Sequence, residues 1–280
     1  MKLVTWNTQW CCGLDGVVSP QRIVDGARAL ADFDVLCLQE VSQGFDGLRG
    51  TPGDQPAQIA ALLPGFQCFF GAATDEFDAD GPRRRFGNLV ATRLPVARVQ
   101  HHPLPWPADP SVESMPRMCS VVTVVSPQLG PLRVMTTHLE YYSAQQRLAQ
   151  ARALRALHDE ACALAAAPPK ASDEGAFRPK VHTAHALLCG DFNAQASDAA
   201  LAAITAPVAE HGLGDAWPLV RSREPHAPTF RVFDTTYGDS PVTYDFVFVS
   251  AGLAPHVRRI EVDVRTRASD HQPVMVEFGA

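Results

Sequence analysis

Short apolar runs recur along the whole chain, and most of them end in a polar side chain. Apolar runs of this length, bounded by turn residues, are typical of buried β-strands. In α/β proteins the residues just past strand ends line the site, so these polar endings are the first place to look for chemistry. We predict strands over residues 3–7, 34–40, 66–70, 88–92, 118–125, 132–137, 187–189, 243–250, 257–264 and 274–278.

Segments with helical periodicity separate several of these strands. Ser19-Pro20 is typical of a helix start, because serine caps the first turn and proline is tolerated there. Ile23, Ala27 and Leu30 then recur at helical spacing. Further predicted helices cover 58–63, 198–204 and a long segment capped by Ser143 and ending near Ala167, with Leu148, Leu154, Leu157 and Leu164 on its buried side.

The segments between these elements are expected to be loops. They cover residues 42–58, 71–87, 103–116, 168–183 and 207–240. We interpret 168–183 as a surface loop and not as a domain linker, because the strand pattern resumes directly after it. The order of strands and helices is compatible with an α/β fold.

One of the strand ends, Leu187 to Asn193, carries an unusually dense polar sequence. Gly190 follows the apolar residues and permits a sharp change of backbone direction. Asp191 and Asn193 are two positions apart, so on an extended segment their side chains share one face. A carboxylate beside an amide suits a cation, an activated water or a phosphate oxygen. A strand that ends in an ordinary Asx turn would have the same residues.

Polar side chains of the same kinds interrupt or end other apolar runs. Carboxylate and amide oxygens suit a hard cation such as Mg²⁺ or Mn²⁺. Two histidines beside them suit proton transfer or the stabilisation of a phosphoryl transition state. Each residue alone could instead be a turn residue, a capping group or a core histidine. The set is Asn7, Glu40, His138, Asp191, Asn193, Asp245, Asp270 and His271.

Composition and charge restrict the partners and the compartment. The 280 residues are 46% hydrophobic and 19% charged, as in a soluble globular protein. The net charge of −6 gives no general attraction to nucleic acid, so a phosphate-bearing partner needs a local basic patch or a metal. Seven cysteines without regular spacing, and no signal peptide or membrane-length apolar run, predict a reduced cytoplasmic protein without a transmembrane segment.

Taken together, several phrases resemble the endonuclease/exonuclease/phosphatase superfamily, which includes deoxyribonucleases, apurinic endonucleases, inositol-polyphosphate phosphatases and neutral sphingomyelinases. The resemblance spans nearly the whole chain, in the order of the family. It implies one domain over residues 1–280, a four-layer α/β sandwich of two face-to-face β-sheets with helices outside and the site at one rim. The phrases are Thr5-Trp6-Asn7, Leu38-Gln39-Glu40, Gly87-Asn88-Leu89, Thr137-His138-Leu139, Gly190-Asp191-Phe192-Asn193, Tyr244-Asp245-Phe246-Val247-Phe248-Val249-Ser250 and Ser269-Asp270-His271-Gln272-Pro273-Val274.

The resemblance also implies a role for each polar residue. Glu40, with Asn7 and Asp270 close by, would hold one or two Mg²⁺ or Mn²⁺ ions. Asp191 would orient or deprotonate the attacking water, and Asn193 would hydrogen-bond the phosphate. His271 would lie against the scissile phosphate, with Asp245 fixing its tautomer. His138 would contact a phosphate oxygen or protonate the leaving group.

The implied activity is divalent-metal-dependent hydrolysis of a phosphate ester, as a phosphodiesterase or nuclease. The alternatives are a phosphomonoesterase acting on a small or lipid-derived phosphate and a catalytically silent binding module. Asn88 and Arg117 are candidate substrate-binding residues. Residues 83–85, three arginines in a predicted loop, could grip phosphates or form a solvated loop tip. The partner is a phosphate ester, with nucleic acid as one possibility, and the sequence is compatible with a monomer.

Overall fold

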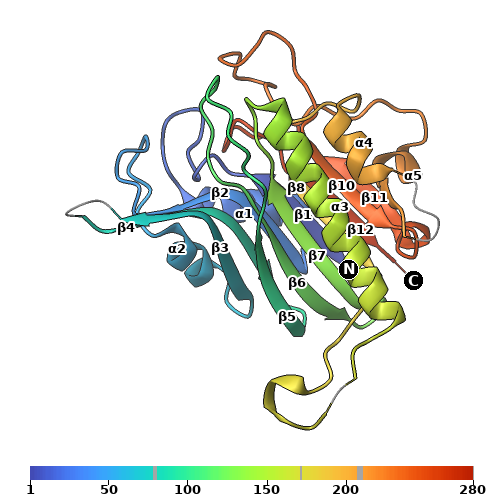
Figure 1. Ribbon diagram of the computed structural model, residues 1–280. Coiled ribbons are helices and arrows are strands. Elements are labelled where there is room, and N and C mark those ends of the chain that lie inside the picture. Colours follow the sequence, from blue (N-terminus) through green and yellow to red (C-terminus); the bar gives the residue numbers. More distant parts are fainter. Residues whose placement is uncertain (78–80, 171, 207–210, 280) are drawn as a thin grey trace.

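The apolar runs form two six-stranded β-sheets in the computed structural model, which describes residues 1–77, 81–170, 172–206 and 211–279. The sheets pack face to face, and helices lie on both outer faces (Figure 1). The predicted four-layer α/β sandwich is therefore confirmed. None of the helices in the described ranges combines the length and the apolar composition that a membrane crossing requires.

The first sheet joins the two ends of the described chain. β1 pairs in parallel with β2 and antiparallel with β12, so the last strand lies next to the first. The strand order is β11 (Val257–Val262), β12 (Val274–Phe278), β1 (Lys2–Asn7), β2 (Val35–Gln43), β4 (Arg83–Thr92) and β3 (Gln67–Phe77).

The second sheet is built from the middle of the chain. β7 pairs in parallel with β8, and the other strand pairs are antiparallel. The strand order is β5 (Val96–Pro103), β6 (Met118–Ser126), β7 (Gly130–His138), β8 (Ala186–Asp191), β10 (Asp245–Ser250) and β9 (Leu213–Asp215).

Helices cover the outer face of each sheet. α1 (Pro20–Leu30) and α2 (Gln55–Leu62) pack on the first sheet through residues such as Ile23 and Ile59. α3 (Ala144–Ala166) and α4 (Ala199–Thr205) pack on the second sheet. The short α5 (Trp217–Arg221) contacts β11. Ser19 and Ser143 accept hydrogen bonds from the first turns of α1 and α3, which confirms both predicted helix starts.

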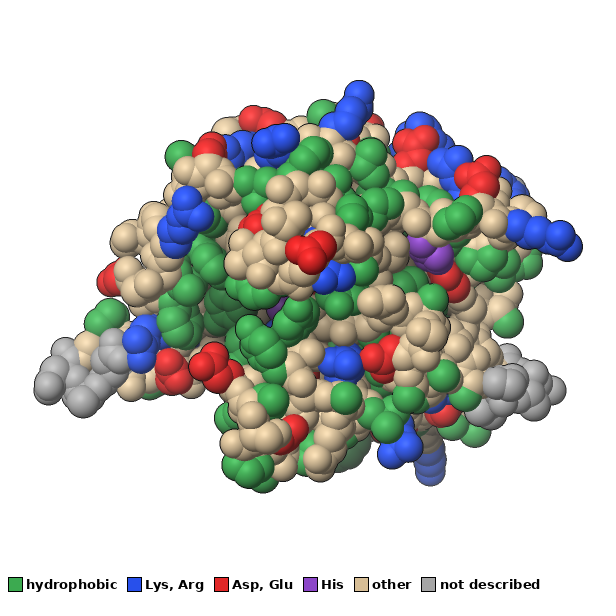
Figure 2. Space-filling model, turned by 90° about the horizontal axis from the view of Figure 1, so that it is seen from above, with side chains coloured by type: hydrophobic (Ala, Val, Ile, Leu, Met, Phe, Trp, Pro, Cys, Tyr) green, Lys and Arg blue, Asp and Glu red, His purple; other side chains and the backbone are tan. Residues whose placement is uncertain are grey.

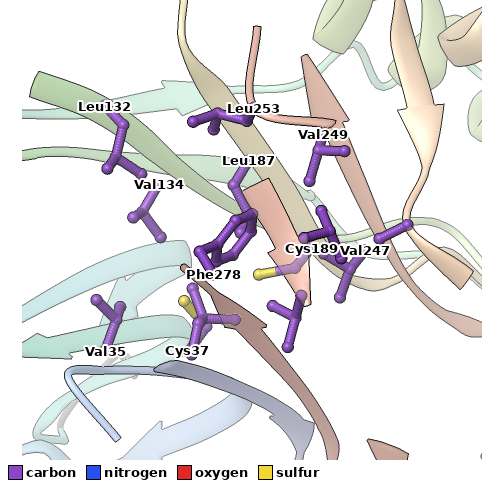
Figure 3. Packing of buried hydrophobic residues seen from close by; sticks show 14 of the residues in the cluster. Val35, Cys37, Leu132, Val134, Leu187, Cys189, Val247, Val249, Leu253 and Phe278 are labelled. Carbon is purple, nitrogen blue, oxygen red and sulfur yellow. The ribbon is translucent and has the colours of Figure 1, made fainter. Parts of the chain in front are cut away.

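Apolar side chains also fill the space between the two sheets. Val35 and Cys37 from the first sheet point toward Leu187 and Val247 from the second (Figure 3). Their side chains are almost completely removed from solvent. Because side chains alternate between the faces of a strand, neighbouring residues in the same strands also serve the outer helices. This explains why the strands read as continuous apolar runs.

The largest departure from the sequence prediction concerns residues 71–87. Much of this segment is a β-hairpin and not a loop, because β3 continues to Phe77 and β4 begins at Arg83. The hairpin projects beyond the sandwich (Figure 1) and so carries polar, solvated side chains that hide its strand pattern. Residues 78–80 of that predicted loop lie outside the described residues.

Smaller departures have similar causes. β5 was not predicted, because it is an edge strand whose residues are only partly buried or exposed. It also contains two adjacent histidines, so it lacks a continuous apolar run. β9 and α5 are short elements within predicted loop 207–240, of which 207–210 lie outside the described residues. The predicted loop 168–183, residue 171 apart, contains one short 3₁₀ turn at Gly175–Phe177. In α3, Leu154 is buried as expected, whereas Leu148, Leu157 and Leu164 are only partly buried.

Candidate active site

The two parallel strand pairs place four polar residues at one rim of the sandwich. β1–β2 and β7–β8 occupy the middle of the two sheets and contact each other across the interior. Parallel strands end at the same sheet edge, so their carboxyl ends meet there. Asn7 and Asp191 are the last residues of β1 and β8, Glu40 lies within β2 just past the partner of Asn7, and His138 ends β7 opposite Asp191.

The antiparallel neighbours bring the remaining residues to the same rim. β10 begins at Asp245, which lies opposite Asp191 in the ladder. β12 begins at Val274 beside the end of β1, so the preceding Asp270 and His271 lie over the rim. The sequence prediction that these strand ends converge therefore holds for all eight residues, including Asn193 beside His138, and they come from both sheets and not from one.

Unusual backbone conformations aim two of these side chains. Glu40 has a φ of 57° and lies where the register between β2 and β4 shifts. A bulge of this kind redirects a side chain out of the strand pattern. Asn193 has a φ of 48°. Non-glycine residues in this region are strained, and such strain is concentrated at functional sites.

Gly190 has a different role from the predicted turn. It pairs with Thr137 inside the β7–β8 ladder, and its φ is 134°. A Cβ atom at this position would lie 2.0 Å from the Thr137 carbonyl oxygen. Glycine therefore permits a close backbone approach that sets the spacing of His138 and Asp191 one residue later.

Asp191 is the hub of the hydrogen bonds at the rim. Its Oδ1 accepts from the backbone N–H of Asn193 at 2.9 Å, and its Oδ2 accepts from Asn7 Nδ2 at 2.9 Å. The Nε2 atoms of His138 and His271 each lie 3.5 Å from the same Oδ2. Burial raises the pKa of Asp191 to about 6, against the lowering effect of the His271 charge.

His271 is held on three sides. Its Nδ1 donates to Asp245 Oδ2 at 2.8 Å, its ring stacks on Phe230 at 4.4 Å between centroids, and its carbonyl accepts from Trp6 Nε1. Burial alone lowers a histidine pKa, but the charges of Asp245 and Asp191 outweigh it and hold the pKa of His271 well above its usual range. These charges favour the protonated ring, and its second nitrogen, Nε2, lies 3.5 Å from Asp191 Oδ2.

His138 has the opposite electrostatic environment. Burial, together with the positive charges of Arg117 and His271, holds its pKa well below the usual range. Its Nε2 accepts from Asn193 Nδ2 at 3.0 Å, and that amide also donates to the Leu139 carbonyl. Both amide hydrogens of Asn193 are thus used, so in this structure Asn193 orients His138; its contact with a phosphate stays a prediction.

Glu40 and Asp270 form the carboxylate pair of the site. Burial raises the pKa of Glu40 to about 7, and the neighbouring charge of Asp270 adds to this shift. Burial likewise raises the pKa of Asp270. Glu40 is partly buried and Asp270 is buried. Two such carboxylates that repel each other are stabilised by a bound cation, and their oxygens suit Mg²⁺ or Mn²⁺. This donor set fits the metal implied by the sequence.

Asn7 connects the carboxylate pair with Asp191. Its Nδ2 donates to Glu40 Oε1 at 3.0 Å as well as to Asp191, and its Oδ1 accepts from the backbone of Gln9. In this arrangement Asn7 orients two carboxylates, and its Oδ1 accepts one hydrogen bond, from the Gln9 backbone. Its role as a metal ligand stays a prediction.

A different triad also has the spacing of a metal site. One ligand atom from each of Asp191, Asp245 and His271 lies within 4.8 Å of the others. The short Nδ1–Oδ2 hydrogen bond between His271 and Asp245 already uses two of these groups. We therefore interpret them as an Asp–His pair beside Asp191, and the Glu40–Asp270 pair as the better cation site.

Arg117 brings a positive charge to the wall of the site. Its side chain is 7% exposed, and its Nε donates to the fully buried Glu140 at 3.2 Å. Its Nη1 is buried without a hydrogen-bond partner among the described residues. Glu140, two residues after His138, was missed from the sequence, although its place just past a strand end was the same signal that identified the others.

Other candidate residues lie elsewhere. Asn88 is buried behind the site, where its amide faces the carbonyls of Met118 and Thr136 at 3.3 and 3.5 Å and so bridges the sheets. It does not line the main cleft, and its contact with substrate stays a prediction. The arginines at 83–85 lie along the hairpin, where Arg83 pairs with Asp75 at 2.6 Å.

The site residues lie at the bottom of a cleft of about 600 Å³. Figure 2 looks down on this face, where hydrophobic side chains gather around a hollow. Sequence reasoning did not place the aromatic residues of the loops, of which Trp106, Phe230 and Tyr237 line the cleft and Phe233 does not. It missed several other lining residues, whose positions share no local pattern. These are Trp10, Phe45, Leu48, Phe86, Met115, Tyr141 and Tyr142.

A two-sheet α/β sandwich with carboxylates, amides and an Asp–His pair at one rim defines a class, that of phosphoester hydrolases. The sequence comparison agrees, because the model of the endonuclease/exonuclease/phosphatase family matches residues 4–271. The chain belongs to this family. A search of curated proteins finds no match.

Solved structures give the same result. An endonuclease/exonuclease/phosphatase from Beutenbergia cavernae is 27% identical, with a TM-score of 0.72 over 100% of this chain and 72% of that chain. A mannosyl-6-phosphatase from Bacteroides thetaiotaomicron is 19% identical, with a TM-score of 0.67 over 100% of both chains. The human Nocturnin catalytic domain is 17% identical, with a TM-score of 0.61 over 100% of this chain and 94% of that one. The last two share the fold.

Proposed function

We propose that this protein is a divalent-metal-dependent phosphodiesterase. The observation that carries the proposal is the convergence of Asp191, the His271–Asp245 pair and the Glu40–Asp270 carboxylates at the bottom of one cleft. Family membership supports hydrolysis of a phosphate ester. The geometry supports the division of labour that follows.

Asp191 is the group that accepts a proton from the attacking water. Its carboxylate is fixed by Asn7 and the Asn193 backbone, and a pKa of about 6 leaves it largely ionised yet basic at neutral pH. The water oxygen forms a bond to phosphorus and its proton passes to Asp191. The ester bond then breaks, and its electron pair leaves on the ester oxygen.

Two cationic side chains face the phosphoryl group in this proposal. The His271 imidazolium, held by Asp245, and the free Nη1 of Arg117 both supply N–H donors. Fixed donors of this kind stabilise charge that develops in the transition state. A cation bound by Glu40 and Asp270 would add Lewis-acid polarisation of a phosphoryl oxygen. Neutral His138 borders the same cleft, where Asn193 orients its Nε2 and Asp191 Oδ2 lies 3.5 Å away.

The charge balance favours a diester over a monoester. Among the described residues that line the cleft, Arg117 is the sole arginine or lysine, and Glu40, Glu76, Asp191 and Asp270 are acidic. A diester brings one negative charge and a monoester brings up to two. The size of the cleft favours a small substrate, so a small phosphomonoester is the second candidate.

Hydrolysis of bis-p-nitrophenyl phosphate and of p-nitrophenyl phosphate, each with Mg²⁺ or Mn²⁺, tests the proposal. We expect the diester to be cleaved faster, and His271→Ala and Glu40→Gln to lower kcat/KM by about 10²–10⁴-fold. Phe177→Ala, which changes a side chain that is 73% exposed and far from the cleft lining, is the control. Faster cleavage of the monoester would select the second candidate. The proposal would be wrong if wild-type protein cleaved neither substrate and the His271→Ala and Glu40→Gln variants showed the same lack of activity.

A further inference from the structure

A connected series of aromatic rings extends from the catalytic histidine to the surface. Phe230 stacks on His271 and lies 6.1 Å from Tyr237, which in turn lies 6.1 Å from Tyr141. Tyr141 contacts Tyr142 at 4.8 Å. Phe230 is buried, whereas Tyr237 and Tyr142 are 47% and 54% exposed. The series therefore begins in the core and ends with open ring faces at the mouth of the cleft.

A second apolar group from the first half of the chain lines the same cleft. Phe45 and Phe86 meet edge to face at 6.1 Å. Trp106 is 52% exposed, and its Nε1 donates to Ser114, which fixes the indole at the rim. Contiguous exposed apolar surface of this kind marks a binding site on a soluble protein. All three side chains line the cleft of about 600 Å³ that contains the site residues.

The charges of the cleft oppose a polyanionic ligand. Arg117 is the sole lysine or arginine in the described lining, where Glu40, Glu76, Asp191 and Asp270 are acidic. Proteins that track a nucleic acid backbone use grooves with many cations. The hairpin arginines do not change this, because none of them is among the residues that line the cleft. Arg83 is paired with Asp75 and Arg84 with Glu76, and Arg85 donates to Gln43. One phosphoryl group is matched by Arg117 and His271, and further phosphates would meet apolar or acidic walls.

We infer that the substrate is a small phosphate ester with a single phosphoryl group and an aromatic organic group that lies against the rings of the cleft. This inference rests on the proposed function and specifies its substrate class. Rings stack well on aromatic side chains, and burial of a phenyl-sized surface gives a large gain in affinity. The organic group contributes binding, while Arg117 and His271 recognise the phosphoryl group.

Binding of non-hydrolysable phosphonates separates this inference from catalysis. Calorimetric titration of wild-type protein with Mn²⁺ compares phenylphosphonate, methylphosphonate and the oligonucleotide dT10. All three offer a phosphorus oxyanion, and only the first combines a single one with an aromatic ring. We expect phenylphosphonate to bind at least about tenfold more tightly than methylphosphonate, and more tightly than dT10.

Variants connect the preference to the rings. Tyr142→Ala and Trp106→Ala should each reduce the ratio of the phenylphosphonate and methylphosphonate affinities by about threefold to tenfold. Phe177→Ala removes an even more exposed ring, 73% accessible and outside the cleft, and should leave the ratio unchanged. For each variant, both affinities are measured on the same preparation. A loss of folded protein then affects both ligands equally and does not change the ratio of their affinities.

The outcomes distinguish the two proposals. Equal affinity for the phenyl and methyl compounds, or tighter binding of dT10, overturns the substrate class, even when bis-p-nitrophenyl phosphate is hydrolysed. A phenyl preference that disappears in Tyr142→Ala and Trp106→Ala supports it. If phenylphosphonate binds preferentially but no phosphate ester is hydrolysed, the cleft is a binding site for aromatic phosphonates. The proposed phosphodiesterase function is then wrong.

Discussion

Arg117 donates from Nε to Glu140 at 3.2 Å, and this buried ion pair leaves Nη1 of the same guanidinium without a partner among the described residues of the cleft wall. Glu140 is fully buried and also accepts from the Tyr142 backbone. The carboxylate therefore fixes the plane of the guanidinium. A positive charge that is held in place in this way can meet a phosphoryl group without reorganisation.

Removing either member of this pair should destabilise the protein. Arg117→Met leaves a buried carboxylate without a counter-charge and should cost about 3–5 kcal/mol of unfolding free energy. The double variant Arg117→Met/Glu140→Gln removes both charges and should recover most of that loss. Urea denaturation measures both.

Activity should not follow stability in this series. The double variant still lacks the guanidinium, so its kcat/KM should stay as low as that of Arg117→Met. Recovery of activity together with stability would show that Arg117 acts only through the fold.

Substitutions at Asp191 and Glu40 should affect turnover and metal affinity differently. Asp191→Asn removes the proton acceptor but leaves the carboxylate pair, so kcat should fall by about 10²–10⁴-fold with little change in Mn²⁺ affinity. Glu40→Gln should weaken Mn²⁺ binding directly. Calorimetric titration with Mn²⁺ and steady-state kinetics on the same samples give both quantities. A large loss of Mn²⁺ binding in Asp191→Asn would overturn this assignment.

Gly190→Ala tests the close approach between β7 and β8. The new Cβ would lie 2.0 Å from the Thr137 carbonyl oxygen, at a φ of 134° that other residues rarely adopt. We expect a loss of about 3–5 kcal/mol of unfolding free energy. Gly214→Ala is the matched control, because no atom lies within 4 Å of its added Cβ. Similar unfolding free energies for the two variants would contradict the steric argument.

His158 should make stability depend on pH. It is fully buried in α3, where its Nδ1 accepts from Arg133 at 2.8 Å and its Nε2 donates to the His211 carbonyl at 3.0 Å. Burial and the Arg133 charge lower the pKa of His158 from 6.5 to about 4. The unfolded chain therefore binds this proton more tightly, and acid favours unfolding.

The contribution of His158 is fully present above about pH 6.5 and is lost as the pH falls toward 4, by at most about 3 kcal/mol. His158→Gln cannot titrate. The difference in unfolding free energy between wild type and this variant should accordingly shrink between pH 7.5 and pH 4.5. Urea denaturation at both pH values measures it, and a constant difference would refute the prediction.

The order and burial of the central strands could be predicted because they are continuous apolar runs. β1, β2, β7, β8 and β12 are covered on both faces, and their polar ends were the correct signal for the rim. The hairpin of β3 and β4 could not be predicted, because its outer half packs against no core and its residues alternate weakly. Edge strands such as β5 are difficult to predict from the sequence for the same reason.

The polar site was more predictable than the surface around it. Site residues sit at strand ends, so local sequence identifies them. The bulge that turns Glu40 and the partner that fixes Arg117 depend on tertiary contacts, which local sequence does not contain. The aromatic walls combine segments as distant as Phe45 and Tyr237, and only the assembled sandwich shows that they share one cleft.

The pairing of β12 with β1 has a consequence for biosynthesis. β12 lies beside β1 although most of the described chain separates the two strands, and it closely follows Asp270 and His271. A nascent chain that ends after β10 already contains Asn7, Glu40 and Asp191, but it lacks the imidazolium and one carboxylate. The eight polar residues of the rim are therefore complete only after synthesis has reached His271, and their arrangement depends on the pairing of β12 with β1.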